Sequence, residues 1–470
     1  MILRNSAFSP SIIKRLLCFM FAFLMCAAAA ACKPPDTPAV SKGGNAAEKP
    51  DFGGETITFC YPWETAKPGS SPAADRAAAH TKTVEKDFNV KIEYKSVNGQ
   101  YYNTNMVNTI LSGKPMGHIL VCSGTFSADY LDSNIFADLS AAITESGADF
   151  KNINRYNQIV RQYSHFNGKQ YGFASGTPGL TDLYVFNKRM LAEANIDLYS
   201  IVKKNEWTFD KLAEISKTLS KDKNNDGIYD VHGLGTQMAE FLAASLTIAN
   251  NGALMKVNAD GKPATAWRDA NSIEALNFMY RLCAVDKTCT YAEGGTWQQG
   301  ATDFANGKYA MMQCSIDYLP ILQEIPMADD YGVICSPRGP KADSYRSGTY
   351  NMWFQFIPVT YKDRAADLLK LYDALIIEDR DNWLDGMDAR VRDEESLKLL
   401  EELSFDSKRL IFDPTSIFGI EWAEPSFAMM LHDMGRGSTT VGAMIDSYDT
   451  QLTSLLNDKW KSHIFTGIDK

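Results

Sequence analysis

The stretch Glu55-Thr-Ile-Thr-Phe-Cys-Tyr61 decides the fold class, together with the segments that follow it. Its β-branched and aromatic residues alternate with other residues, which predicts a strand. Val90 to Tyr94 and His118 to Cys122 predict two more strands, the last of them buried. Residues 73–88 and 102–112, which lie between these strands, have the apolar spacing of helices. The alternation predicts an α/β fold with a mostly parallel sheet.

The loops after two of these strands are the first places to look for function, because ligands bind beyond the carboxyl ends of parallel strands. Residues 62–66 follow the first strand and bring Trp63 and Glu64. Residues 123–127 follow the third and bring Ser123, Gly124 and Thr125.

From about residue 205 the pattern predicts a largely helical chain, whose next helix has Thr208 as its N-cap. Trp207 beside it is interpreted as a packing residue at the start of this helix. Further helices are predicted at 238–250, 270–284, 364–377, 393–402 and 441–456, and a strand at 354–359.

The N-terminal 52 residues have a different character. Three basic residues precede an uncharged run, Leu16 to Ala31, that is shorter than the roughly 20 residues needed to span a bilayer. This predicts a signal peptide over 1–31. Ala29-Ala-Ala-Cys32 resembles a bacterial lipobox, with Ala29 in place of the usual Leu, and implies lipidation (palmitate) at Cys32. A plain cleaved signal peptide is the alternative.

Residues 32–52 are rich in Pro, Ala, Gly and Lys and predict a flexible tether. The 418 residues that follow (53–470) exceed one ordinary core and imply two domains or lobes. A net charge of −10 argues against a nucleic-acid partner. Of the cysteines beyond the tether, Cys283 and Cys289 could bridge or could be buried as small apolar residues; both interpretations stay open.

Several motifs, in this order, resemble the family 1 extracellular solute-binding proteins of ABC importers, the maltose-binding-protein-like receptors. They cover 53–460 and are clearest in these stretches: Phe166-Asn-Gly-Lys-Gln-Tyr-Gly-Phe173, Leu183-Tyr-Val-Phe-Asn-Lys188, Ala194-Asn-Ile-Asp197, Trp207-Thr-Phe-Asp210, Asn225-Asp-Gly-Ile-Tyr-Asp-Val-His-Gly233, Phe304-Ala-Asn-Gly-Lys-Tyr-Ala-Met311, Tyr331-Gly-Val333 and Ser336-Pro-Arg-Gly-Pro340.

The resemblance implies a two-lobe periplasmic-binding-protein-like fold of type II, with a multi-strand hinge and a ligand cleft between the lobes. It places the crossovers at Tyr171 to Thr181, at Ile334 to Pro337 and near 380–410. The implied division is 53–174 for the first part of lobe 1, 175–336 for the first part of lobe 2, 337–385 for the second part of lobe 1, and 386–470 for the C-terminal helices of lobe 2.

One loop has the spacing of a calcium-binding loop. Its oxygen ligands at positions 1, 3, 5, 7 and 9 would be Asp222, Asn224, Asp226, the Ile228 carbonyl and Asp230. Position 12 is Gly233 in place of the usual bidentate Glu. Structural calcium is therefore one hypothesis, and a polar turn after a helix is the other.

Sugar sites combine aromatic faces with polar side chains that satisfy hydroxyl groups. The candidates are loop residues at strand ends and at positions implied by the family: Trp63, Glu64, Ser123, Gly124, Thr125, Asp317, Tyr318, Tyr350, Trp353 and Trp422, with Asn351, Glu421 and Trp297 as further possibilities.

The resulting hypothesis is a monomeric, lipid-anchored receptor on the outer face of a Gram-positive-type cell membrane. It would bind a small solute, namely a mono- or oligosaccharide, and deliver it to ABC permease subunits without catalysis. The sequence contains no His-Glu-x-x-His, Gly-x-Ser-x-Gly or P-loop motif. The alternatives are a cell-surface glycan-active enzyme, such as a hydrolase or lyase, and a surface sensor or adhesin without transport function.

Overall fold

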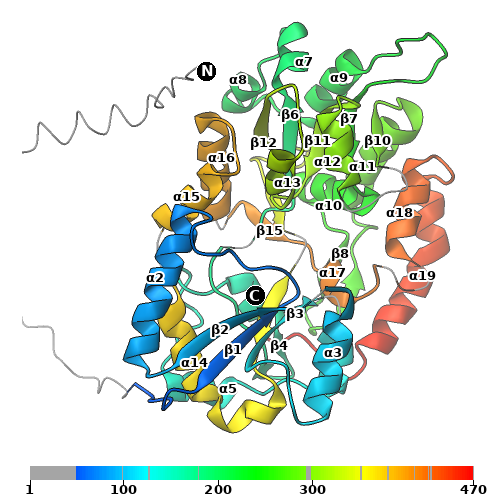
Figure 1. The fold of residues 1–470 in the computed structure, drawn as a ribbon. Helices are drawn as coiled ribbons and strands as arrows, with labels where there is room; N and C mark the ends of the chain where they lie inside the picture. The colour runs from blue at the N-terminus through cyan, green and yellow to red at the C-terminus, as the bar shows by residue number, and fades with distance from the viewer. Residues whose placement is uncertain are drawn as a thin grey trace, which may run out of the picture. The chain divides into compact units, whose positions relative to one another are not determined.

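The computed structural model describes residues 49–468 apart from 98, 125–126, 178, 293–297, 350–351, 378–379, 407, 422 and 424–425. The predicted signal peptide, Cys32 and almost all of the predicted tether lie outside the described residues. Within the described part the chain forms two α/β lobes, each built around a sheet of its own (Figure 1). The predicted α/β class is confirmed.

The sheet of lobe 1 has the strand order β14-β3-β1-β2. Its strands are β1 (Thr56–Tyr61), β2 (Lys91–Ser96), β3 (Ile119–Ser123) and β14 (Trp353–Phe356). β2 and β3 pair in parallel with β1, whereas β14 runs antiparallel to β3. The three N-terminal strands are found where the sequence predicts them. The strand predicted at 354–359 begins one residue earlier and gives way to a short 3₁₀ helix, η3 (Val359–Arg364).

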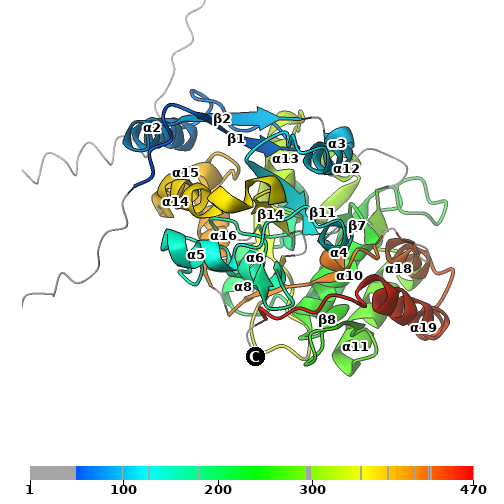
Figure 2. The same ribbon diagram turned by 90° about the horizontal axis from the view of Figure 1, so that it is seen from below.

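Helices cover both faces of this sheet. The face that carries Ile57 and Phe59 packs against α2 (Pro72–Asp87), α5 (Ser140–Ser146) and α14 (Ala365–Leu375) (Figure 2). The opposite face, with Cys60, packs against α3 (Gly99–Leu111) through Tyr102. The rest of the lobe comprises α4 (Ser127–Asp132), α6 (Gln158–Tyr163), and the hairpin of β4 (His165–Phe166) and β5 (Lys169–Gln170).

The strand order makes the carboxyl ends of β1 and β3 a switch point. The connection through α2 leads from β1 to β2 on one side, and the connection through α3 leads back to β3 on the other. The hydroxyl of Tyr102 donates to the Cys60 carbonyl at 2.9 Å and accepts from the Val121 amide at 3.0 Å. This hydroxyl stands between β1 and β3, and the two strands separate just before residues 62 and 123. An open α/β sheet binds ligands where neighbouring strands separate in this way.

The sheet of lobe 2 has the order β10-β7-β11-β6-β12. Its strands are β6 (Leu183–Asn187), β7 (His232–Thr236), β10 (Cys289–Tyr291), β11 (Tyr309–Cys314) and β12 (Tyr331–Cys335). β7, β10 and β11 are parallel, and β6 runs antiparallel to its two neighbours. The chain after residue 205 is largely helical, as predicted, but the pattern did not predict the four strands that it contributes to this sheet. Short apolar runs, and a strand with two glycines such as 232–236, lack the alternation that identifies a strand.

The helices of lobe 2 agree better with the sequence. α10 (Ala239–Ala249) is buried along its whole length and packs against α11 (Ala270–Tyr280) and α18 (Phe427–Gly435). Thr208 caps α9 (Phe209–Leu219), as predicted, by accepting from the Lys211 amide. The remaining elements are α7 (Lys188–Glu193), α8 (Leu198–Lys203), β8 (Met255–Val257), β9 (Pro263–Thr265), the π-helical turn η2 (Arg281–Val285), α12 (Gln299–Ala305), α13 (Tyr318–Glu324), α16 (Glu394–Phe405) and α19 (Val441–Lys459).

The chain passes from the first sheet to the second between Phe173, which pairs with Gln355, and Leu183. The return comes later than the sequence predicts. Residues 334–337 stay with lobe 2, and the chain runs through β13 (Ser347–Thr349) before Trp353 enters the first sheet. β13 pairs with β15 (Leu410–Phe412).

Buried Asp182 ties these crossings together. Its carboxylate accepts hydrogen bonds from the Ser245 hydroxyl at 2.6 Å, from the Ser336 hydroxyl, and from the Gly348 amide at 2.9 Å. Burial raises the pKa of Asp182, and the three donors oppose that shift. Since the donors come from α10, the end of β12 and β13, this one carboxylate fixes the base of the hinge.

A further passage between the lobes runs through α15 (Arg380–Asp388), which packs on both α2 and α16. After α19 the chain returns to lobe 1, where Phe465 pairs with Phe166. The C-terminal segment is therefore not confined to lobe 2.

Trp207 is completely buried and donates its indole N–H to the Cys335 carbonyl at 2.9 Å, as expected of a packing residue. All six cysteines in the described region are buried and free, so Cys283 and Cys289 form no bridge in this structure. Among the described helices, none has the length and apolar character needed to cross a membrane.

Candidate functional site

Two tryptophans meet at the switch point of lobe 1. Trp63 follows β1, and Trp353 begins β14, opposite Ser123 at the end of β3. Their ring centroids lie 5.0 Å apart in an edge-to-face arrangement, and each side chain is more than 40% exposed (42% and 44%). Large aromatic side chains are usually buried, so an exposed pair at a strand edge is a candidate surface for a partner or ligand.

The end of β3 supports this pair. The Gly124 amide donates to the Met352 carbonyl at 2.8 Å, which holds the start of β14 in place. A Cβ atom at Gly124 would lie 3.0 Å from Ile417 Cγ1 and 3.3 Å from the Met352 carbonyl oxygen. Gly124 is itself buried, so its role in this structure is to let residue 417 approach.

A buried acidic pair lies in lobe 2. Glu240 is in the first turn of α10, directly beyond the carboxyl end of β7, and its side chain is 2% exposed. Its Oε1 atom has no hydrogen-bond partner among the residues that the structure describes. Burial, followed by the nearby Glu421 carboxylate, raises the pKa of Glu240 to about 8. Glu240 is therefore a largely protonated acid at neutral pH, able to donate one hydrogen bond and accept another.

Residues 413–421 connect the two parts of the site. Asp413 precedes the short helix α17 (Thr415–Phe418) and accepts from the Thr415 amide at 2.9 Å. Ile417 then packs against Gly124 in lobe 1, and Glu421 interacts with Glu240 in lobe 2. One short segment thus contacts both the aromatic edge of lobe 1 and the acidic end of α10.

The other candidates are distributed as follows. Glu64 is exposed and pairs with Lys67 at 3.7 Å, and Ser123 is partly exposed beside Trp353. Asp317 is exposed where β11 ends. Tyr318 is completely buried in the core of lobe 2, so no solute reaches it in this conformation, and we remove it from the candidates. Thr125, Trp297, Tyr350, Asn351 and Trp422 lie outside the described residues.

The loop that resembles a calcium site is held by its own backbone. The carboxylate of Asp222 accepts from the amides of Asn225, Asp226 and Gly227, and Asp230 accepts from the Lys223 amide. In the described part of the chain no three His, Cys, Asp or Glu side chains gather into a possible metal site. In this structure the aspartate side chains therefore accept backbone hydrogen bonds within the loop.

Glu240 is a candidate site residue that the sequence pattern does not predict, whereas Trp63 and Trp353 were predicted. Its sequence context, Met-Ala-Glu-Phe-Leu, is that of an ordinary helix start. The only available signal was its position just after an unrecognised strand, β7. Chemically, the site combines flat apolar surfaces in lobe 1 with hydrogen-bonding carboxyl groups in lobe 2, and contains no nucleophile–base pair among the residues named.

The sequence matches one family model, described as bacterial extracellular solute-binding protein, over residues 68–370. No curated protein matches the chain. Structures with the same fold include an ABC substrate-binding protein from Listeria monocytogenes in complex with cycloalternan. It is 17% identical, with a TM-score of 0.57 over 87% of this chain and 99% of that one.

Two further structures share the fold. UgpB from Mycobacterium tuberculosis, in complex with glycerophosphocholine, is 15% identical, with a TM-score of 0.62 over 86% of this chain and 99% of that one. The sugar-binding protein MalE from the phytopathogen Xanthomonas citri is 14% identical, with a TM-score of 0.59 over 86% of this chain and 98% of that one.

Proposed function

The chain belongs to the bacterial extracellular solute-binding proteins, and from this premise we propose that it is a carbohydrate receptor of an ABC importer. In this role it captures a mono- or oligosaccharide between its lobes and presents the closed complex to membrane permease subunits. The receptor acts as a monomer and catalyses no reaction.

The exposed pair of Trp63 and Trp353 is the observation that carries the carbohydrate assignment. A sugar ring has an apolar face of C–H groups that packs on an indole ring, whereas its hydroxyl groups need polar partners once they leave water. Glu240 and Glu421 supply such partners at the other lobe. Two structures with the same fold, one a complex with cycloalternan and one a sugar-binding protein, support the same class of solute.

We infer that the receptor works by hinge closure, because the two lobes offer different chemical groups to the solute. A solute favours the closed form only if it binds that form more tightly than the open form. Stacking on Trp63 and Trp353 engages lobe 1, and hydrogen bonds to the carboxyl groups engage lobe 2, so only a closed receptor makes both sets of contacts. The Asp182 network at the base of the crossings would act as the fixed end of this motion.

A thermal-shift screen against mono- and oligosaccharides tests the proposal. A solute at 100 times its Kd stabilises the folded protein by about 2.7 kcal/mol, which shifts the melting temperature measurably. The expected result is a shift with at least one saccharide, and small-angle scattering should show a smaller radius of gyration in that complex. Release of products from labelled oligosaccharides would contradict the receptor assignment and favour a glycan-active enzyme.

We also propose that a lipid on Cys32 anchors the mature receptor to the outer face of the cell membrane, in an envelope of Gram-positive type. The support is the sequence motif before Cys32 and the tether that follows it. A receptor held near its permease gains effective concentration without new contacts. Replacing Cys32 with Ala should move the protein from the membrane fraction to the medium, and unchanged fractionation would rule out the anchor.

A further inference from the structure

A strip of aromatic side chains extends outward from the tryptophan pair. Trp63 lies 5.9 Å from Tyr61, and Tyr61 lies 6.4 Å from Tyr94, measured between ring centroids. Tyr94 stands on the edge strand β2 and is 43% exposed. The strip therefore continues from the carboxyl edge of the lobe 1 sheet along its outer strand.

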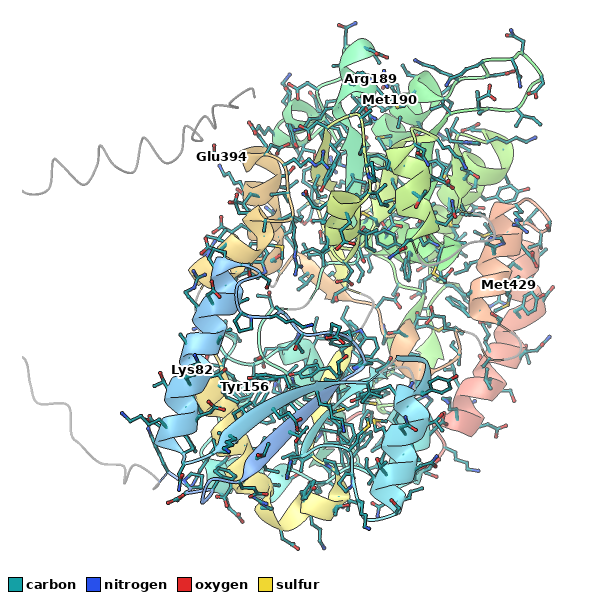
Figure 3. All side chains as sticks on the ribbon, viewed as in Figure 1. Lys82, Tyr156, Arg189, Met190, Glu394 and Met429 are labelled. Carbon is teal, nitrogen blue, oxygen red and sulfur yellow. The ribbon has the colours of Figure 1, made fainter. Side chains whose placement is uncertain are left out.

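The strip forms one wall of a cavity of about 510 Å³ between β2, α2 and the loop that joins β1 to α2. This volume falls within the range of small-ligand pockets, about 300–1,000 Å³. Thr81, Lys82 and Glu85 of α2 bring polar groups to the opposite wall. Lys82 is labelled on α2 in Figure 3, and Figure 1 shows α2 lying alongside β2.

Small side chains keep this groove open. Ala77 and Ala78 line it from α2, and one turn further along the helix the Thr81 hydroxyl lies 3.5 Å from the Tyr94 hydroxyl. The result is a half-exposed aromatic wall facing a polar wall, the combination that also marks the site at Trp63 and Trp353. The same indole of Trp63 contacts Trp353 and lines the groove, so the two places are continuous.

We propose that this groove, defined by Tyr61, Trp63, Tyr94, Ala78, Thr81 and Glu85, is a subsite for further sugar units of a glycan whose end is bound at the tryptophan pair. The inference rests on the proposed carbohydrate function and specifies it: the receptor selects oligosaccharides over monosaccharides. Aromatic faces pack against successive sugar rings, and the side chains of α2 satisfy their hydroxyl groups.

The test is calorimetric titration of the purified protein with α-1,4- and α-1,6-linked gluco-oligosaccharides of one to six units. In the wild type, affinity should rise with chain length. Tyr94→Ala should weaken binding of the longer glycans by roughly 2- to 12-fold, the range set by one aromatic contact, and leave the monosaccharide affinity unchanged. Tyr101→Ala is the matched control, because Tyr101 is a 58% exposed aromatic outside the strip.

A second variant fills the groove, whereas Tyr94→Ala removes part of its wall. Ala78→Trp places a large side chain in the groove and should abolish the gain in affinity with chain length while the short sugars still bind. Equal affinity for all lengths, or an unchanged length dependence in both variants, would overturn the subsite and leave the receptor function standing. Failure of every saccharide to bind the wild type would overturn both.

Discussion

The two lobes differ in the chemistry of their candidate site residues. Lobe 1 offers Trp63 and Trp353, aromatic and more than 40% exposed, on the edge of a sheet. Lobe 2 offers two acidic side chains, Glu240, which is 2% exposed at the start of a buried helix, and Glu421, which is 8% exposed on the segment before α18. The aromatic surface is accessible to a solute in this conformation, whereas the buried carboxyl groups can reach one only after the segments around them have moved. In the proposed receptor, lobe 1 would therefore make the first contact and lobe 2 the selective one.

Local chain geometry explains the difference. In lobe 1, ten residues separate β1 from α2, and this long loop carries Trp63 out to the surface. In lobe 2, β7 ends at Thr236 and α10 begins at Ala239, so Glu240 is carried directly into the core. Four predictions test the contrast, in order of expected size.

Removing the aromatic surface should have the largest effect. The double variant Trp63→Ala, Trp353→Ala should weaken binding of the best saccharide about 100-fold, because buried interface aromatics dominate binding energies. Its melting temperature should change little, since both rings are largely exposed in the free protein. Calorimetric titration measures the first effect and thermal unfolding the second. Phe405→Ala, an exposed aromatic on α16, is the control, and equal losses in both variants would remove the special role of the pair.

The stability of the folded protein should depend on pH through Glu240. Burial raises the pKa of Glu240 from 4.5 to about 8, so the folded state holds this proton more tightly than the unfolded state. Stability from this group is complete below pH 4.5 and is lost as the pH rises toward 8, by up to about 1.4 kcal/mol per pH unit. Between pH 6 and 7.5 this group should lower the free energy of unfolding by about 2 kcal/mol.

Glu240→Gln keeps the shape of the side chain and removes its titration. Urea unfolding across pH 5–8 should therefore show a flatter stability profile for the variant than for the wild type. Parallel profiles would mean that Glu240 does not titrate in this range.

A substitution at the contact between Gly124 and Ile417 should have an effect of intermediate size on stability. Gly124→Ala adds a methyl group 3.0 Å from Ile417, in a buried position where the neighbouring backbone cannot move far. Overpacking of this kind costs about 1–3 kcal/mol, and we expect a loss near the lower limit. Denaturant unfolding measures it. If stability were unchanged and only saccharide affinity fell, Gly124 would be a binding residue and not a packing one.

The smallest effect concerns the loop at Asp222, for which we propose weak structural calcium binding. Its aspartates accept backbone hydrogen bonds in this structure, so a bound ion must share or replace those interactions. Calcium at about four times its Kd would raise stability by about 1 kcal/mol. Melting curves after chelation and after addition of millimolar calcium measure this. No shift, or the same shift in Asp222→Asn, would leave the loop a simple polar turn.

Local pattern was enough for the elements whose sequences alternate or repeat with a clear period. β1, β2 and β3, the long helices α2, α10, α11 and α19, and the cap at Thr208 were all predictable, because each depends on residues a few positions apart. The tryptophans at strand ends were also accessible, since the ends of parallel strands are where sites form. β7 was not predicted because its residues, His-Gly-Leu-Gly-Thr, do not alternate between apolar and polar. Glu240, which follows β7, was therefore not recognised as a candidate site residue.

Tertiary structure alone decided the rest. It brought Trp63 against Trp353 and Glu240 near Glu421, pairs far apart in the chain that no local spacing connects. It also buried Tyr318, which the sequence left among the candidates. The physical reason is that local propensity depends on neighbouring residues, whereas exposure, pairing and pKa depend on which distant segments pack together. The sequence by itself determined the kinds of residue available for the proposed site, and the packing of the chain decided which of them lie together.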